Sequence, residues 1–384
     1  MKANLTEKIA VAVIRFFLNI IYKLCCLKKR KNLAIFITRQ SDSPSYNFTE
    51  IANRINQNNI ETQFLCTKLS RKNILKYAVH AIGTVNALAR CKICYLERYD
   101  PIVSLIKFHN NDKNYKYPDK PIVVQLWHAF GAFKKFGYQC ADTPEGHSSD
   151  VMKLYRIHKN YSYVLCSSKA CQLPFAKAFN IEKSRVIPCP LPELDRLKSM
   201  NLKNKNQADK AGKADKASAQ VLFAPSLRND KNSPHPMRDM YLSGKWKNSL
   251  DSRQVLWSFH PLELKTDTLG SSCDLLFQSD IIITDYSSLV YEAFLLNKKV
   301  LFYCPDIEEY RKSPGLNSDP KIICPDITFM NEADLFSFIN LLLNDKVAYP
   351  YQALTDFCGL AFNLPSEMHC ESSVAKLEKE LFLR

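Results

Sequence analysis

The sequence has none of the spacings that mark a metal site or a disulfide framework. Its fourteen cysteines are scattered, and Cys91 and Cys94 form the only CxxC pair, without a second pair or a histidine set to complete a zinc site. Asp100, Asp195 and Asp285 show no metal-type clustering either, so we expect no metal and no cofactor. The CxxC pair lies in an apolar run that is typical of a buried strand, and reduced thiols fit a cytoplasmic compartment.

A secretory cleavage site is also missing, because the apolar N-terminal stretch leads straight into the basic run Lys28–Lys31. The stretch itself is interrupted by polar residues, and their spacing places them on one helical stripe. These residues are Lys8, Arg15, Asn19 and Lys23. A long uncharged run, which a membrane span would need, is therefore lacking.

A spanning helix would bury Arg15 and Lys23 near the bilayer centre, at a cost of about 2.5–3.5 kcal/mol each. We therefore predict that residues 1–31 form an amphipathic helix in the membrane interface, with the polar stripe facing water. The side chains expected to dip into the membrane are Ile14, Phe16, Phe17, Ile20, Ile21 and Leu24. The alternatives are a helix packed on the protein's own core and a true membrane span.

Most of the chain has little excess charge, although the formal net charge is +15. Residues 1–32 carry eight Lys and Arg against one Glu, and residues 198–219 carry six Lys against two Asp. Since no basic stripe is expected on a folded face, we exclude a nucleic-acid partner. An anionic membrane surface is the better partner, and we expect a peripheral protein on the cytoplasmic side of the cell membrane.

Apolar runs that alternate with helical patterns predict an α/β protein with parallel sheets. The 384 residues suit two doubly wound Rossmann-like lobes, at residues 32–197 and 220–384. Residues 198–219 have no apolar face and are predicted to form a polar linker or a loose polar helix. The expected strands are residues 33–38, 62–66, 93–96, 121–126, 163–167, 185–188, 220–224, 255–259, 281–284 and 300–303. Ligands bind at the carboxyl ends of such strands.

Two strand ends in the second lobe carry candidates for binding an anion. Ser287 and Ser288 follow an apolar strand and open a helix, where free N–H groups and the helix dipole favour a phosphate. Arg228 follows another strand through Pro225 and Ser226, and its guanidinium suits a diphosphate. The alternatives are an ordinary serine N-cap and a surface ion pair.

Two histidines, His128 and His260, also follow apolar strands. His128 is followed by small residues and then by Lys134 and Lys135, which are close enough to meet a phosphate. An imidazole that titrates near neutral pH is a suitable base for an acceptor hydroxyl. A structural role is the alternative for each histidine.

Together these stretches resemble the CDP-glycerol glycerophosphotransferase family of teichoic acid and capsule synthesis, which itself resembles glycosyltransferases of the GT-B fold. The matching pieces span roughly residues 33–345 and are Arg39-Gln40-Ser41, Gln125-Leu126-Trp127-His128 with Lys134-Lys135, Ala224-Pro225-Ser226-Leu227-Arg228, Phe259-His260-Pro261, Thr284-Asp285-Tyr286-Ser287-Ser288 and Asp306-Ile307-Glu308-Glu309-Tyr310-Arg311. Two stretches depart from the family pattern. Residues 129–134 differ from the usual Gly-Thr-Pro-Leu-Lys, and residues 311–319 lack the family's two aromatics.

The resemblance implies a GT-B-like enzyme that transfers glycerol phosphate from CDP-glycerol to a hydroxyl of an undecaprenyl-diphosphate-linked glycan and releases CMP. It also implies that the paired serines and Arg228 hold the CDP diphosphate and that both histidines are required for activity. The further substrate-binding candidates are Arg39, Pro225, Ser226, Asp285, Lys134 and Lys135. The alternatives are a CDP-ribitol donor, a GT-B glycosyltransferase that uses a nucleotide sugar, and a non-catalytic membrane scaffold. The chain shows no further N-terminal domain, which resembles single-transfer priming enzymes more than polymerases.

Overall fold

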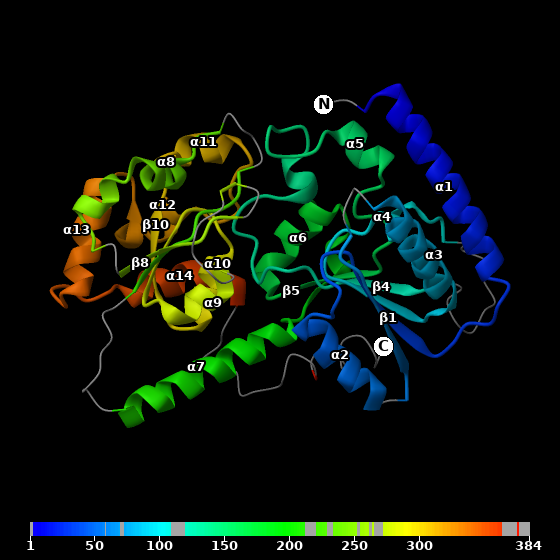
Figure 1. Cartoon of the computed structure of the whole chain (residues 1–384), viewed down its shortest axis with the longest axis horizontal. Coiled ribbons are helices and arrows are strands. Elements are labelled where there is room, and N and C mark those ends of the chain that lie inside the picture. Colours follow the sequence, from blue (N-terminus) through cyan, green and yellow to red (C-terminus); the bar gives the residue numbers. More distant parts are fainter. Residues whose placement is uncertain are drawn as a thin grey trace. The chain divides into compact units, whose positions relative to one another are not determined.

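The computed structural model describes residues 3–57, 59–69, 73–108, 120–211, 220–228, 233–251, 254–260, 263–264, 272–362 and 375. The chain divides into two compact units. Unit 1 comprises residues 1–128, 147–193 and 369–384, and unit 2 comprises residues 129–146 and 194–368. Each unit has its own parallel sheet (Figure 1), so the predicted α/β fold with two parallel sheets is confirmed.

Unit 1 is built on six parallel strands in the order β2-β1-β3-β4-β5-β6. The strands are β1 (Leu33–Thr38), β2 (Glu61–Cys66), β3 (Ile93–Leu96), β4 (Ile122–Gln125), β5 (Tyr163–Cys166) and β6 (Val186–Pro188). The helices are α1 (Leu5–Cys25), α2 (Tyr46–Gln57), α3 (Ile74–Arg90), α4 (Pro101–Leu105), α5 (Ser149–Leu154) and α6 (Gln172–Phe179). Strand β3 is buried along its whole length, as expected for a parallel strand covered on both faces.

Unit 2 is built on five parallel strands in the order β11-β10-β9-β7-β8. The strands are β7 (Val221–Phe223), β8 (Val255–Trp257), β9 (Ile281–Thr284), β10 (Lys299–Tyr303) and β11 (Thr328–Phe329). The helices are α7 (Pro192–Ala211), α8 (Pro236–Ser243), α9 (Ser272–Gln278), α10 (Leu289–Leu295), α11 (Ile307–Lys312), α12 (Pro320–Ile323), α13 (Glu332–Leu343) and α14 (Tyr351–Phe362). The central strand β9 is fully buried.

The segment of residues 129–146 follows β4 in the chain but packs in unit 2, which the predicted domain boundary did not foresee. The ring of Phe133 lies 4.9 Å from that of Phe357 and forms part of the core of unit 2. Gly131 lies against Tyr291 so closely that a Cβ atom there would come within 2.3 Å of the ring. Aromatic packing and a close backbone approach therefore tie this segment to unit 2.

Helix α7 crosses the predicted boundary between the first domain and the linker. Pro192 suits the first turn of a helix, and the sequence has no further glycine or proline before Gly212. The first part of the predicted linker, up to Ala211, is therefore helical. The rest of it, residues 212–219, lies outside the described residues.

Helix α1 packs against α3 and α4 through a narrow face that buries Val11, Leu18 and Tyr22. The side chain of Asn19 donates to the carbonyl oxygen of Leu105 and accepts from the N–H of Lys107. Asn19 thus satisfies backbone groups at the end of α4. Its prediction as part of a stripe that faces water is wrong.

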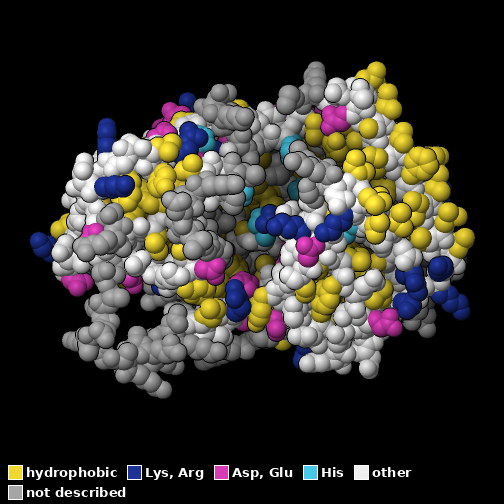
Figure 2. Space-filling model, viewed as in Figure 1, with side chains coloured by type: hydrophobic (Ala, Val, Ile, Leu, Met, Phe, Trp, Pro, Cys, Tyr) yellow, Lys and Arg dark blue, Asp and Glu magenta, His cyan; other side chains and the backbone are white. Residues whose placement is uncertain are grey.

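Apart from the exposed Lys8, Arg15 and Lys23, much of the remaining surface of α1 is apolar and continues onto α3. Figure 2 shows hydrophobic side chains gathered over the region where these two helices lie. The apolar face consists of exposed Leu5, Ile9, Val13, Ile14, Phe16, Phe17, Ile20, Leu24 and Leu27 together with Ile74, Leu75, Val79 and Ile82. Among the described helices, none is long and apolar enough to cross a membrane.

Candidate active site

Both sheets have the strand order in which a ligand crevice opens at a topological switch point. In unit 1 the order in which successive strands are added to the sheet reverses between β1 and β3, and in unit 2 it reverses between β7 and β9. At such a point the loops after the two strands diverge to opposite faces of the sheet and leave room for a ligand. The residues that follow these four strands are therefore the first candidates for binding substrate.

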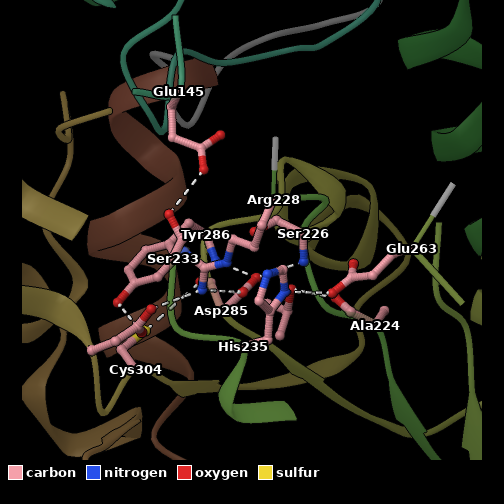
Figure 3. A network of polar contacts seen from close by, with 12 residues as sticks. Glu145, Ala224, Ser226, Arg228, Ser233, His235, Glu263, Asp285, Tyr286 and Cys304 are labelled. Atoms are coloured by element: carbon pink, nitrogen blue, oxygen red, sulfur yellow. Dashed lines mark hydrogen bonds and ion pairs between the residues drawn. The ribbon is translucent and has the colours of Figure 1, made fainter. Parts of the chain in front are cut away.

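The switch point of unit 2 holds a buried arginine between two carboxylates (Figure 3). The Arg228 Nη2 atom lies 3.0 Å from Asp285 Oδ2 and 3.1 Å from Asp306 Oδ2. The guanidinium also lies over the Tyr310 ring, 4.5 Å from its centroid, and Tyr310 stacks on Tyr286. All three charged side chains are at most 6% exposed.

Asp285 connects the loops after β7 and β9. Its Oδ1 atom accepts hydrogen bonds from the N–H groups of Ser226 and Tyr286. The Thr284 hydroxyl donates to the carbonyl oxygen of Ala224 and joins the same two strand ends. One carboxylate therefore fixes both loops, which is the arrangement expected of a preorganised binding site.

This geometry gives Arg228 two buried ion-pair partners. Burial lowers the pKa of the guanidinium, but the attraction of Asp285 and Asp306 outweighs that effect and the pKa is raised. Burial raises the pKa of Asp306, and the arginine opposes this shift. The guanidinium is therefore enclosed and its charge is compensated, and its contact with the CDP diphosphate stays a prediction.

The two predicted lysines reach unit 2 through the segment of residues 129–146. Lys134 forms an antiparallel bridge with Leu316, and the Lys135 N–H donates to the carbonyl oxygen of Gly315. Burial lowers the pKa of Lys134, while the charge of Asp285 acts in the opposite direction. Lys134 is thus electrostatically coupled to the carboxylate at the β7/β9 switch point.

The two serines after β9 have different surroundings. The Ser287 hydroxyl accepts a hydrogen bond from the Leu289 N–H at the start of α10, and its contact with a phosphate stays a prediction. Ser288 occupies the N-cap position of α10 without a side-chain cap bond. Both are half-buried, and Pro225 in the facing loop is half-buried as well.

His260 lies just past the end of β8 and is exposed. Its carbonyl oxygen accepts from the N–H groups of Glu263 and Leu264, which forms a turn. The Glu263 carboxylate lies 2.8 Å from His235 Nδ1, and both of these side chains are 5% exposed. This buried pair, which the sequence reasoning did not identify, fixes the turn that carries His260.

His128 belongs to unit 1 and lies at the carboxyl end of β4. It is exposed, and its ring centroid lies 4.2 Å from that of Trp127. Trp127 has a φ of 63°, which is uncommon for a bulky residue, and its N–H donates to the buried Gln125 side chain. Strained backbone of this kind is often found at functional sites, so it supports a role for His128.

Arg39 follows β1 at the switch point of unit 1. Its Nε atom lies 2.9 Å from Asp100 Oδ2, and its Nη2 atom donates to the carbonyl oxygen of Tyr99. Asp100 in turn caps α4 through the N–H groups of Ile102 and Val103. Arg39 therefore ties the loop after β1 to the loop after β3, in addition to any contact with substrate.

Unit 2 thus brings together Ser226, Arg228, Asp285 and Lys134, whereas Arg39 and His128 are placed in unit 1. Asp306, which follows β10, completes the network, and its position after a strand was a signal in the sequence. Among the described residues, no group of His, Cys, Asp and Glu has the arrangement of a metal site.

Two doubly wound units whose strand ends carry histidines, serines and a buried ion-pair network are the framework expected of an enzyme that binds its ligand at the strand ends. The family model described as CDP-Glycerol:Poly(glycerophosphate) glycerophosphotransferase matches residues 20–356. The chain belongs to this family and is an enzyme of the polyol-phosphate transferase type, as the sequence motifs predicted.

The chain is similar to a teichoic acid ribitol-phosphate primase of Bacillus spizizenii, with 29% identity over 82% of this chain and 87% of the relative. It is also similar to a teichoic acid glycerol-phosphate primase of Bacillus subtilis, with 25% identity over 65% of each chain. The solved structure of the wall teichoic acid polymerase TagF shares the fold, with a TM-score of 0.64 and 14% identity over 99% of this chain and 98% of that chain.

Proposed function

We propose that the chain transfers glycerol phosphate from CDP-glycerol to a hydroxyl of a lipid-linked glycan, such as one carried on undecaprenyl diphosphate, in teichoic acid or capsular polysaccharide synthesis. The family match over both sheets carries this proposal. The exposed imidazole of His128 at a strained strand end supplies the chemistry that an acceptor hydroxyl requires.

In the proposed reaction His128 removes the proton of the acceptor hydroxyl. The oxygen then attacks the donor phosphorus nearest the polyol, a new P–O bond forms, and the bond to the CMP oxygen breaks. The negative charge of the phosphates is stabilised by hydrogen bonds from Ser287, Ser288 and the N–H groups of their turn. His260 is a further hydrogen-bond donor. Positioning and electrostatic stabilisation account for most of the catalysis in such a displacement.

The charge balance of unit 2 supports a role in binding the donor. Arg228 pairs with Asp285 and Asp306, and the charge of Asp285 also raises the pKa of Lys134 against the effect of burial, so the charges of this cluster offset one another. The phosphates would therefore meet serine hydroxyls and backbone N–H groups held in place by the buried cluster.

CDP-ribitol is the second candidate for the donor. The observation that favours it is the 29% identity to a ribitol-phosphate primase over 82% of the chain, compared with 25% over 65% for a glycerol-phosphate primase. Parallel assays with CDP-glycerol and CDP-ribitol, with CMP release as the readout, decide between them. A nucleotide sugar consumed in their place would contradict both.

Replacing Ser287 and Ser288 together by Ala is expected to weaken binding of the CDP donor. Hydrogen bonds to a charged group contribute about 1.5–3 kcal/mol each, so the loss is expected in the affinity measured by calorimetry. The matched control is Ser279→Ala, because Ser279 is a buried serine at the other end of β9. Unchanged affinity in the double variant would show that the serines only cap the helix.

We further propose that the apolar face of α1 and α3 lies on the cytoplasmic surface of the cell membrane. The face is far larger than the scattered apolar residues of an ordinary surface. The basic run Lys28–Lys31 follows α1 directly, so attraction to anionic lipid adds about 1 kcal/mol per residue to apolar insertion. An interfacial position suits an enzyme whose acceptor is held by a lipid.

The double variant Phe16→Asp, Val79→Asp is expected to bind anionic vesicles at least tenfold more weakly in a sedimentation assay. Both positions are exposed, at 62% and 65%, so the fold should tolerate the change. Leu242→Asp, at a 63% exposed position on α8, is the control and should bind as the parent does. Substitution is preferable to deletion of residues 1–30, since deletion would uncover the groups that pack against α1. If the parent, the double variant and Leu242→Asp sediment with the vesicles to the same extent, the membrane proposal is refuted.

A further inference from the structure

The switch point of unit 1 holds a polar cluster, formed by Glu97, Ser45 and Asn47, that has no role in the proposed displacement. Glu97 follows β3 directly, and Ser45 and Asn47 lie on the loop after β1 and at the start of α2. The Ser45 hydroxyl and the Asn47 amide both donate to Glu97 Oε1. The cluster therefore joins the two loops between which a doubly wound sheet binds its ligand.

The partners of Glu97 are themselves held in place. The Ser45 hydroxyl accepts from the Phe48 N–H, and the Asn47 side-chain oxygen accepts from the Glu193 N–H. This leaves the orientation of the Glu97 carboxylate fixed before any ligand arrives, which lowers the entropic cost of binding.

One oxygen of this carboxylate is available to a ligand. Among the described residues, the two side chains that donate to Glu97 both bind its Oε1 atom, and the Glu97 side chain is only half-buried. Burial raises the pKa of Glu97, and its two hydrogen bonds and the charge of Arg98 oppose this shift. A carboxylate oxygen with open lone pairs accepts hydrogen bonds, so it suits the hydroxyl groups of a sugar or polyol and repels a phosphate.

The sheet register places this carboxylate on the edge that carries His128. Leu96 pairs with Gln125, and the Leu126 N–H donates to the Leu96 carbonyl oxygen. Glu97 and His128 therefore follow neighbouring parallel strands at the same end. A ligand hydroxyl held by Glu97 would therefore lie at the same edge of the unit 1 sheet as His128.

We propose that Glu97, oriented by Ser45 and Asn47, is an acceptor-binding residue that accepts a hydrogen bond from a hydroxyl of the acceptor glycan. The inference rests on the proposed function, because it assigns the glycan to unit 1. It names one residue that binds the acceptor, and it names the part of the acceptor that this residue contacts, a neutral glycan rich in hydroxyl groups.

The test uses the full chain and a disaccharide diphosphate on a short polyprenyl tail as the probe. Glu97→Ala and Ser45→Ala are compared with Glu61→Gln, because Glu61 is an exposed carboxylate at the opposite end of the same sheet. Glu97→Gln is included because the amide retains one acceptor oxygen and preserves the packing. Binding of the probe is measured without donor, and KM is then measured for probe and donor separately.

We expect Glu97→Ala to weaken probe binding and raise the KM for the probe about tenfold or more, with the KM for the CDP donor unchanged. Ser45→Ala and Glu97→Gln should have smaller effects of the same kind, and Glu61→Gln should have none. Probe affinity within twofold of the parent in Glu97→Ala, an equal loss of donor affinity, or a parent chain that does not bind the probe would each overturn the inference. If the parent binds the probe but transfers nothing from either CDP donor, the proposed function fails. The comparison of probe binding between the parent and Glu97→Ala still decides whether Glu97 binds the glycan.

Discussion

Replacing His128 by Ala is expected to lower kcat by about 10²–10⁴-fold, because a positioned general base contributes that much to a proton transfer. His128 is exposed, so the substitution leaves no cavity, and the thermal midpoint should stay close to that of the parent. The rate is measured as CMP release at saturating donor and acceptor, together with circular dichroism to verify the fold.

His147→Ala is the matched control for this experiment. His147 is another exposed histidine of unit 1, but it does not follow a strand in the chain, and its loss should leave turnover within about twofold of the parent. Donor affinity should be unchanged in the His128 variant, since the donor is assigned to unit 2. Normal turnover by His128→Ala would exclude the histidine as the base.

Replacing Asp285 by Ala is expected to destabilise unit 2 by about 3 kcal/mol. Removal of one partner from a buried ion pair costs about 3–5 kcal/mol, and the lower end applies because Arg228 keeps Asp306. The same change releases the N–H groups of Ser226 and Tyr286, so the donor loops lose their common anchor. We expect donor binding to fall below detection in calorimetry. The free energy of unfolding is measured by urea denaturation.

Asp280→Ala provides the control at the opposite end of β9. Asp280 is exposed, and its side chain accepts a hydrogen bond from the Gln220 N–H. Its replacement should therefore lower the free energy of unfolding by no more than about 1 kcal/mol. If Asp285→Ala were as stable as Asp280→Ala and still bound the donor, the buried cluster would not organise the site.

The strands and the family could be predicted from the sequence because their signals are local. The run Ile281–Thr284 is apolar and β-branched, and it forms β9 with the predicted bounds. The run Leu33–Thr38 forms β1 in the same way. Residues that follow such strands share one edge of the sheet, which is why Ser226 and Asp285 could be predicted to lie together.

Other features could not be predicted from the sequence because they depend on contacts that are distant along the chain. Nothing near Arg228 shows that Asp306, 78 positions later, takes up its charge. The polar character of Asn19 predicts contact with water, yet its partners lie on α4. Residues 129–146 pack in unit 2 through Phe133 and Gly131, whose neighbours are encoded in the second half of the chain. Tertiary contacts of this kind override local pattern.

The most direct test of the central claim is a transfer assay with the purified chain, in which CDP-glycerol or CDP-ribitol is mixed with a lipid-linked glycan acceptor in anionic vesicles. We predict that CMP is released and that the acceptor gains the mass of one or more polyol phosphates, and that both signals disappear in His128→Ala. Release of CMP without a change in the acceptor mass, or no reaction with either CDP-polyol, would contradict the assignment as a polyol-phosphate transferase acting on a lipid-linked glycan.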